Sequence, residues 1–214
     1  MRIAVLNETS AADRNADILA ALGGRGHDVV NVGMRKSFDP PELTYLHTAF
    51  LSGVLLGSGR ADLVVGGCGT GQGYLNAVLQ YPGVVCGHLL TPLDAWLFGQ
   101  INGGNCVSLM LNQGWGWASD TNLRMLFDAL FQVESGCGYP PHRRESQQAS
   151  RALLADLSRA THRSLADIVA AVDDRIASPA LAYPGVREIL DLPTLADRDL
   201  AAALSDRMDR ATAR

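Results

Sequence analysis

The chain lacks the features that mark nucleic-acid-binding, secreted or membrane-spanning proteins. Its 214 residues carry 18 Lys and Arg against 22 Asp and Glu, and no basic run is interleaved with aromatic residues. A nucleic-acid partner is therefore not expected. No apolar run reaches 18 residues, and the N-terminus does not have the layout of a signal peptide. We expect no membrane partner and a cytoplasmic location.

Cysteine and cofactor motifs are also sparse. The four cysteines lie at positions 68, 86, 106 and 137, without any Cys-x-x-Cys spacing, which is neither a zinc pattern nor a disulfide framework. The chain has no Gly-Lys-Ser/Thr sequence, and its main glycine cluster does not have the Gly-x-Gly-x-x-Gly spacing of dinucleotide sites. The second predicted strand ends in Asn31-Val32-Gly33, without the acidic residue that binds a ribose. We expect neither a metal nor an organic cofactor.

What the chain does have is a regular succession of short apolar runs. Hydrophobic residues make up 47% of the sequence and charged residues 19%, as in a globular protein with one sizeable core. Helical spacing separates the runs, so a β-α unit repeats five times, which predicts an α/β fold: a Rossmann-like three-layer structure with a five-stranded parallel sheet. The predicted strands are residues 2–6, 27–32, 61–66, 84–87 and 105–110.

The C-terminal part has a different composition. We expect residues 1–160 to form the α/β domain and residues 161–214, which are rich in Ala, Asp and Arg, to form a helical extension packed on the core or on a neighbouring subunit. Helices are predicted at 164–176, 186–191 and 194–211, with Pro179, Pro184 and Pro193 as breaks.

The most informative stretch is residues 61–73, in which a buried strand runs into five glycines. Glycines at a strand-to-helix turn let a ligand approach the backbone, and the helix start turns free N–H groups and a positive dipole end toward it. Such a turn can hold an anion or a developing oxyanion. Cys68 lies in this positive environment, which favours the thiolate, and Thr70 adds a hydroxyl. The alternative is that Cys68 is a small core residue, as most free cysteines are.

The sequence Cys68-Gly69-Thr70-Gly71-Gln72-Gly73 resembles the Cys-Gly-Thr-Gly-x-Gly signature of the ribose-5-phosphate isomerase B and galactose-6-phosphate isomerase family. The resemblance covers roughly residues 1–160. It implies an aldose–ketose isomerase in which Cys68 moves a proton between C1 and C2. The amides of Gly69, Gly71 and Gly73 would then hold the enediolate, helped by Thr70. Family members are dimers or tetramers with sites completed across a subunit boundary, so a homodimer or homotetramer is expected.

Three substrate-binding candidates come from the first half of the chain. Asn7 and Glu8 follow the first strand at the same sheet edge as Cys68, although Glu8 could equally be a solvated acid in the first turn of a helix. Ribose-type relatives have Asp-His where this chain has Glu8-Thr9. Tyr45 lies near the point where a family tyrosine faces the sugar. His47 is expected to be a satisfied surface or interface histidine instead.

The later candidates depart from the family pattern. Ribose-type relatives have His-Asn-x-x-Asn where this chain has Ile101-Asn102-Gly103-Gly104-Asn105, so Asn102 and Asn105 remain candidates but the ring-opening histidine is missing. Ordinary turn-forming asparagines are the alternative. Arg143 or Arg144 matches the first of two phosphate-binding arginines, and Arg143 is the candidate we retain. Gln147 and Gln148 lie one turn later, so the second arginine is missing as well.

Two further features are open to more than one interpretation. Trp115 and Trp117 alternate with glycines and could stack on a sugar ring or pack at a subunit interface. His88 directly follows the fourth predicted strand, and an isolated histidine there supports only a weak functional prediction.

The sequence therefore predicts an aldose–ketose isomerase that acts on a small-molecule sugar. A pentose or hexose phosphate ranks first. Because the histidine and one arginine are missing, a non-phosphorylated acid sugar from unsaturated uronate breakdown is the alternative substrate. A non-catalytic sugar-binding protein on the same scaffold is the alternative function, since fold alone does not decide activity.

Overall fold

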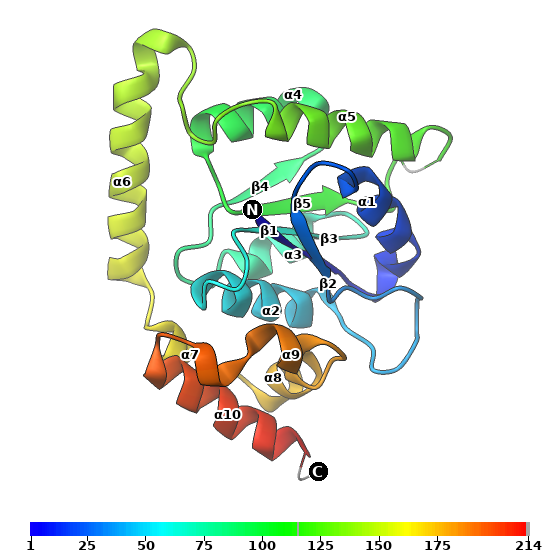
Figure 1. The fold of residues 1–214 in the computed structure, drawn as a ribbon, viewed down its shortest axis with the longest axis vertical. Helices are drawn as coiled ribbons and strands as arrows, with labels where there is room; N and C mark the ends of the chain where they lie inside the picture. The colour runs from blue at the N-terminus through cyan, green and yellow to red at the C-terminus, as the bar shows by residue number, and fades with distance from the viewer. Residues whose placement is uncertain (115, 213–214) are drawn as a thin grey trace.

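The computed structural model describes residues 1–114 and 116–212. Its five strands form one sheet in the order β2-β1-β3-β5-β4, and every neighbouring pair is parallel (Figure 1). This confirms the predicted α/β fold with its five-stranded parallel sheet. The strands are β1 (Arg2–Asn7), β2 (Asp28–Asn31), β3 (Leu63–Cys68), β4 (Cys86–Leu89) and β5 (Cys106–Met110).

Helices cover both faces of the sheet, because alternate residues of each buried strand face opposite cores. Ile3 and Val5 of β1 join one cluster, whereas Ala4 and Leu6 join the other. The first cluster is covered by α1 (Asn15–Leu22), α4 (Pro92–Leu97) and α5 (Ser119–Phe131), and the second by α2 (Tyr45–Gly57) and α3 (Gln72–Val78). A 3-10 helix, Thr9–Arg14, precedes α1, and a π-helical turn, Phe98–Asn102, follows α4.

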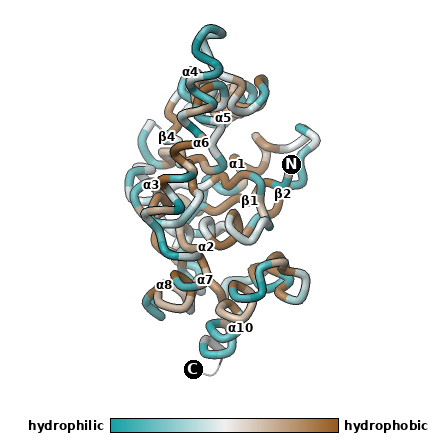
Figure 2. The backbone as a smooth tube through the Cα atoms, turned by 90° about the vertical axis from the view of Figure 1, so that its left-hand side faces the viewer, coloured by the Kyte–Doolittle hydropathy of each residue, from teal (hydrophilic) through white to brown (hydrophobic). Residues whose placement is uncertain are grey.

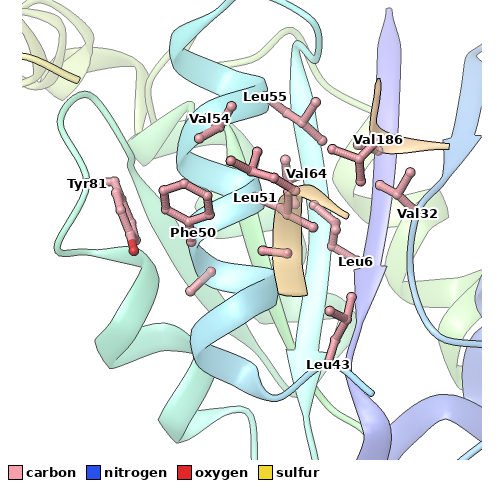
Figure 3. Close-up of a cluster of buried hydrophobic side chains, with 14 of the residues drawn as sticks. Leu6, Val32, Leu43, Phe50, Leu51, Val54, Leu55, Val64, Tyr81 and Val186 are labelled. Carbon is pink, nitrogen blue, oxygen red and sulfur yellow. The ribbon is translucent and has the colours of Figure 1, made fainter. Parts of the chain in front are cut away.

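The C-terminal extension lies on the outer side of α2, at the end of the molecule opposite α4 and α5 (Figure 2). Its apolar residues join the same core as the sheet: Val186 packs beside Leu6 and Val32 (Figure 3). Its helices are α7 (Leu165–Ala171), α8 (Asp174–Leu181), α9 (Val186–Leu190) and α10 (Arg198–Thr212), and a 3-10 turn at Leu192–Thr194 lies between α9 and α10.

Pro179 does not break the chain as the sequence predicted. It lies inside α8, at the sixth position of an eight-residue helix. Proline has no N–H, so it removes one intrahelical bond, the one to the carbonyl of Arg175. The helix tolerates it and ends two residues later.

Helix α6 (Arg144–Thr161), preceded by a 3-10 turn at Pro141–Arg143, stands along one side of the molecule and links the α5 end to α7 (Figure 1). None of its residues is buried. Leu153, Leu154 and Leu157 are 68%, 46% and 56% exposed. Within the described ranges, no helix has both the length and the apolar character needed to cross a bilayer.

Candidate functional site

The candidate site lies where the strand order reverses. The chain passes from β1 to β2 on one side and then to β3 on the other, so the carboxyl ends of β1 and β3 border the crevice in which open α/β sheets bind ligands. Asn7 pairs with Gly67 in this register, which brings the Glu8 and Cys68 backbones to the same edge. Cys68 is the last residue of β3, whereas the sequence predicted a strand that ends at Gly66.

The glycine turn is fixed by its neighbours on β5. The carbonyl of Cys68 accepts hydrogen bonds from the N–H groups of Gly71 and Leu111, at 3.2 and 3.1 Å. Ser108 donates its hydroxyl to the carbonyl of Gly71 at 2.6 Å. Gly71 itself has φ +73°, a left-handed conformation, and caps α3. Hydrogen bonds from Ser108 and Leu111 therefore fix the conformation of the turn without a ligand.

Side chains from other elements lie against two glycines of the turn. A Cβ on Gly71 would stand 2.5 Å from Nε2 of His88, so the imidazole closes the turn from beneath. His88 belongs to β4 rather than following it. A Cβ on Gly73 would stand 3.4 Å from the ring of Tyr45. The structure thus brings Tyr45, at the start of α2, against the glycine turn.

A carboxylate and a hydroxyl tie the end of β1 to the turn. Glu8 accepts hydrogen bonds from the N–H of Ser10, at 3.1 Å, and from its hydroxyl. Ser10 Oγ in turn accepts from the N–H of Gly69 at 3.2 Å. Asn112 completes the arrangement, since its side chain donates to the carbonyl of Ser10 at 2.6 Å and its N–H to that of Gly69 at 2.9 Å.

Sequence reasoning missed Ser10 and Asn112. The signal for Ser10 is its place just after the first strand, two residues beyond Glu8.

Cys68 and Thr70 carry the groups that can act on a ligand. Cys68 is 7% exposed, and its Sγ makes no hydrogen bond within the part of the chain that the structure describes. Thr70 is exposed; its Oγ1 accepts from the N–H of Gln72 at 3.3 Å, which leaves its O–H free to donate. Among the described residues, the backbone N–H groups of Thr70 and Gly73 have no protein acceptor.

The side chain of Asn7 makes its hydrogen bonds to other residues of the chain, behind the site. Its side chain is buried and donates to the carbonyls of Ala11 and Met34, at 3.0 and 2.9 Å. Its Oδ1 accepts from Asn15 at 2.6 Å. These bonds connect the loops after β1 and β2, so in this structure Asn7 orders the site rather than facing a ligand.

The remaining candidates do not reach Cys68 within one chain. Asn105 precedes β5, at the amino edge of the sheet, and bonds to the N–H of Val85 and the carbonyl of Gly83, at 2.9 and 3.0 Å. Met110, five residues further along β5, is the partner of Cys68, which puts Asn105 roughly 17 Å from the thiol along the strand. Asn102 ends the π-helical turn, which also lies at the amino edge of the sheet. Arg143 lies in the 3-10 turn before α6.

Two other cysteines are enclosed differently from Cys68. Tyr74 fills the space behind β3, with its hydroxyl 2.6 Å from Ser52 Oγ and 3.4 Å from Cys106 Sγ. Burial raises the pKa of Tyr74, and the hydrogen bond with Cys106, followed by burial, raises the pKa of the Cys86 thiol. We therefore read the Cys86 thiol as neutral and structural.

Neither interpretation of the tryptophan pair is tested by the structure. Trp117 is fully exposed, and Trp115 lies outside the described residues. Across residues 1–114 and 116–212, no group of three His, Cys, Asp or Glu side chains is placed to hold a metal ion.

A thiol, a hydroxyl and unpaired N–H groups lie around the glycine turn, at the switch point of a parallel sheet, an arrangement that can hold a small anionic ligand. Residues 3–129 match the family model described as Ribose/Galactose Isomerase, and the chain belongs to this family. It is therefore a sugar isomerase, an aldose–ketose isomerase by the activity of its relatives. Among curated proteins, none matches the chain significantly.

Similar solved structures agree with this family assignment. The chain is 36% identical to a crystal structure of 4-deoxy-L-threo-5-hexosulose-uronate ketol-isomerase complexed with a tartrate, with a TM-score of 0.92 over 98% of this chain and 100% of that one. It is 38% identical to a structure named ribose-5-phosphate isomerase LacAB_rpiB from Vibrio parahaemolyticus, with a TM-score of 0.90 over 97% and 99%. A shorter isomerase B from Clostridium thermocellum shares the fold, at 17% identity and a TM-score of 0.61 over 75% of this chain and 99% of that one.

Proposed function

We propose that the protein interconverts an aldose and a ketose by proton transfer at Cys68. The thiolate takes the proton from C2 of the aldose, and the electron pair moves into a C1–C2 double bond as the C1 carbonyl becomes an enediolate oxygen. The thiol then returns a proton to C1, and the hydroxyl proton of O2 passes to O1, so the ketose forms without any other reactant. The observation that carries this proposal is the unpaired Cys68 thiol beside the glycine turn.

The donors around the thiol suit the enediolate. The hydroxyl of Thr70 and the N–H groups of Thr70 and Gly73 are available, whereas the N–H of Gly69 is bonded to Ser10. One well-placed donor to a developing oxyanion contributes about 10² to 10³ in rate, and a positioned general base about 10² to 10⁴. Tyr45 forms the wall beside Gly73.

The proposed active form is a homo-oligomer, because Asn102 and Arg143 can join Cys68 only from a second copy. Helix α6 supports this: an 18-residue amphipathic helix with no buried residue has an apolar face that needs a partner. Arg143 lies directly before α6, so a second copy that covers this helix would also bring Arg143 to a new surface.

We propose that the substrate is a sugar that carries one carboxylate. A sugar phosphate is the second candidate. A phosphate clamp needs a second cation one turn beyond Arg143, where this chain has Gln147. The Gln147 side chain is hydrogen-bonded to the backbone of Tyr139: its Oε1 accepts from the Tyr139 N–H at 2.9 Å, and its Nε2 donates to the Tyr139 carbonyl at 2.7 Å. Ile101 cannot open a ring by proton transfer. A structure named as a uronate ketol-isomerase matches over 98% of this chain, which supports an acid sugar. Sugar phosphates remain the second candidate, since another structure of similar likeness is named for ribose 5-phosphate.

Proton NMR in D₂O tests this proposal. Wild type and Cys68→Ser are incubated with unsaturated-uronate breakdown products and with pentose and hexose phosphates. We expect deuterium at C1 or C2 of one acid sugar with wild type and none with Cys68→Ser. Cys137→Ser is the matched control, because its Sγ donates to Gln100 Oε1, away from the glycine turn.

Exchange with a sugar phosphate alone would reverse the order of the substrates. If Cys68→Ser retained exchange, the cysteine-base mechanism would be wrong. Binding without exchange in wild type would instead favour a sugar-binding protein.

A further inference from the structure

His47 connects the C-terminal extension to the start of α2. Its Nδ1 accepts a hydrogen bond from the backbone N–H of Thr44 at 2.8 Å, which completes a capping box with the Thr44 side chain. A ring nitrogen that accepts from an N–H carries no proton, so in the neutral imidazole the proton is on Nε2. That nitrogen lies 2.8 Å from the carbonyl of Arg175 in α8 and donates to it.

The carbonyl of Arg175 is free because of Pro179. In a helix this carbonyl would accept from the N–H four residues later, and proline has none. His47 supplies the missing donor from another element. The proline and the histidine, 132 positions apart in the sequence, thus form one hydrogen-bonding unit between α8 and α2.

A second contact ties the extension to the loop before α2. Tyr183 donates its hydroxyl to the carbonyl of Gly33 at 3.3 Å. The loop that begins there is bound to Thr9, whose carbonyl accepts from Ser37 Oγ at 2.7 Å and whose Oγ1 accepts from the N–H of Phe38 at 3.1 Å. The extension therefore contacts the segment from residue 33 to residue 47 near both of its ends.

This segment includes Tyr45, whose ring lies against Gly73 of the glycine turn. We propose that His47 is a positioning residue: through its bond to Arg175, the C-terminal extension holds the first turn of α2, and with it Tyr45, against the substrate crevice. The extension would then act on substrate binding without placing a side chain in the site. The kinetic part of this inference rests on the proposed function.

Two substitutions of His47 distinguish its bond to the Thr44 N–H from its bond to the Arg175 carbonyl. Gln at this position can accept from Thr44 and also donate to Arg175, whereas Glu can complete the capping box but has no N–H to donate. We expect His47→Glu to lower hydrogen-exchange protection of the Thr48 amide, which donates to the carbonyl of Thr44 at the start of α2, roughly three- to tenfold, the size of one hydrogen bond. KM should rise by a similar factor with kcat within about twofold, because the chemistry at Cys68 is untouched. His47→Gln should restore both values.

Pro179→Ala provides an independent check. This substitution gives the Arg175 carbonyl its intrahelical donor, so His47→Glu should cost much less in the Pro179→Ala background than in wild type. His162→Gln is the control for losing a histidine elsewhere, since its ring bonds to the carbonyl of Ser158 at the end of α6.

Unchanged exchange of the α2 amides in His47→Glu would overturn the proposal, and so would an equal effect in both backgrounds. The exchange measurement needs no substrate. If wild type isomerised no sugar, the proposed function would fail while this inference was still decided by the amides of α2.

Discussion

The hydroxyl of Ser10 stands between the carboxylate of Glu8 and the N–H of Gly69, 3.2 Å from that nitrogen. A carboxylate that accepts from the hydroxyl fixes its orientation, so the oxygen lone pairs face the turn. The acid that follows β1 therefore acts on the glycine turn through a serine. Two of the three loop amides expected to face a sugar are already bonded, that of Gly69 to Ser10 and that of Gly71 to the carbonyl of Cys68.

Ser10→Ala should weaken both catalysis and folding. Without the hydroxyl, the Gly69 end of the turn is no longer tied to β1, and the buried Glu8 loses a partner, a change of about 1.5–3 kcal/mol for a hydrogen bond to a charged group. We expect kcat/KM to fall about tenfold or more, and the melting temperature to fall by several degrees. Ser58→Ala, which removes a hydroxyl bonded to Leu55 at the other end of α2, should leave kcat/KM unchanged. Equal values for the two variants would show that the Ser10 bond is incidental.

Gly71→Ala should destabilise the protein more than Gly83→Ala. Both glycines have nearly the same left-handed φ, +73° and +71°, which costs an alanine about 1–2 kcal/mol. Around Gly83 a Cβ would meet nothing within 4 Å, whereas at Gly71 it would meet His88 Nε2. The difference between the two free energies of unfolding, from urea titrations, isolates the steric part, and we expect about 1–3 kcal/mol. No difference would mean that His88 moves aside freely.

The sequence was sufficient where the determining interactions are local. Buried parallel strands are short apolar runs, and the turn from Cys68 to Gly73 has glycines at alternate positions of one short segment, so both could be predicted. The role of Asn7 could not, because its partners Ala11, Asn15 and Met34 come together only in the fold. Nor could the distance between Asn102 and Cys68, which depends on the strand register. Pro179 was misjudged for the same reason, since its effect depends on where α8 begins.

Alkaline pH should destabilise the protein through Tyr81. Burial raises the pKa of Tyr81 to about 12, from about 10 in the unfolded chain. Below pH 10 the side chain is neutral in both states. Above it, the unfolded chain loses the proton first, so stability falls by up to about 1.4 kcal/mol per pH unit until about pH 12. Urea midpoints at pH 8, 10.5 and 11.5 should show a shallower fall for Tyr81→Phe, with part of the slope left because the pKa of buried Tyr74 is also raised. Tyr139→Phe, at an exposed position, should follow wild type.

Subunit mixing tests whether two chains build each site. Cys68→Ser and Arg143→Ala should each lose most activity, the first by removing the base and the second by removing the anion partner. If Arg143 acts on the Cys68 of another chain, a mixed dimer has one site with both substitutions and one with neither. Random reassembly of equal amounts, by co-refolding, should then restore about a quarter of wild-type activity, because half of the dimers are mixed and each has one intact site. Mixing Cys68→Ser with Cys68→Ala supplies no intact site and is the control. Without restoration, Arg143 would act within its own chain or not at all, and the exposed face of α6 would need another explanation.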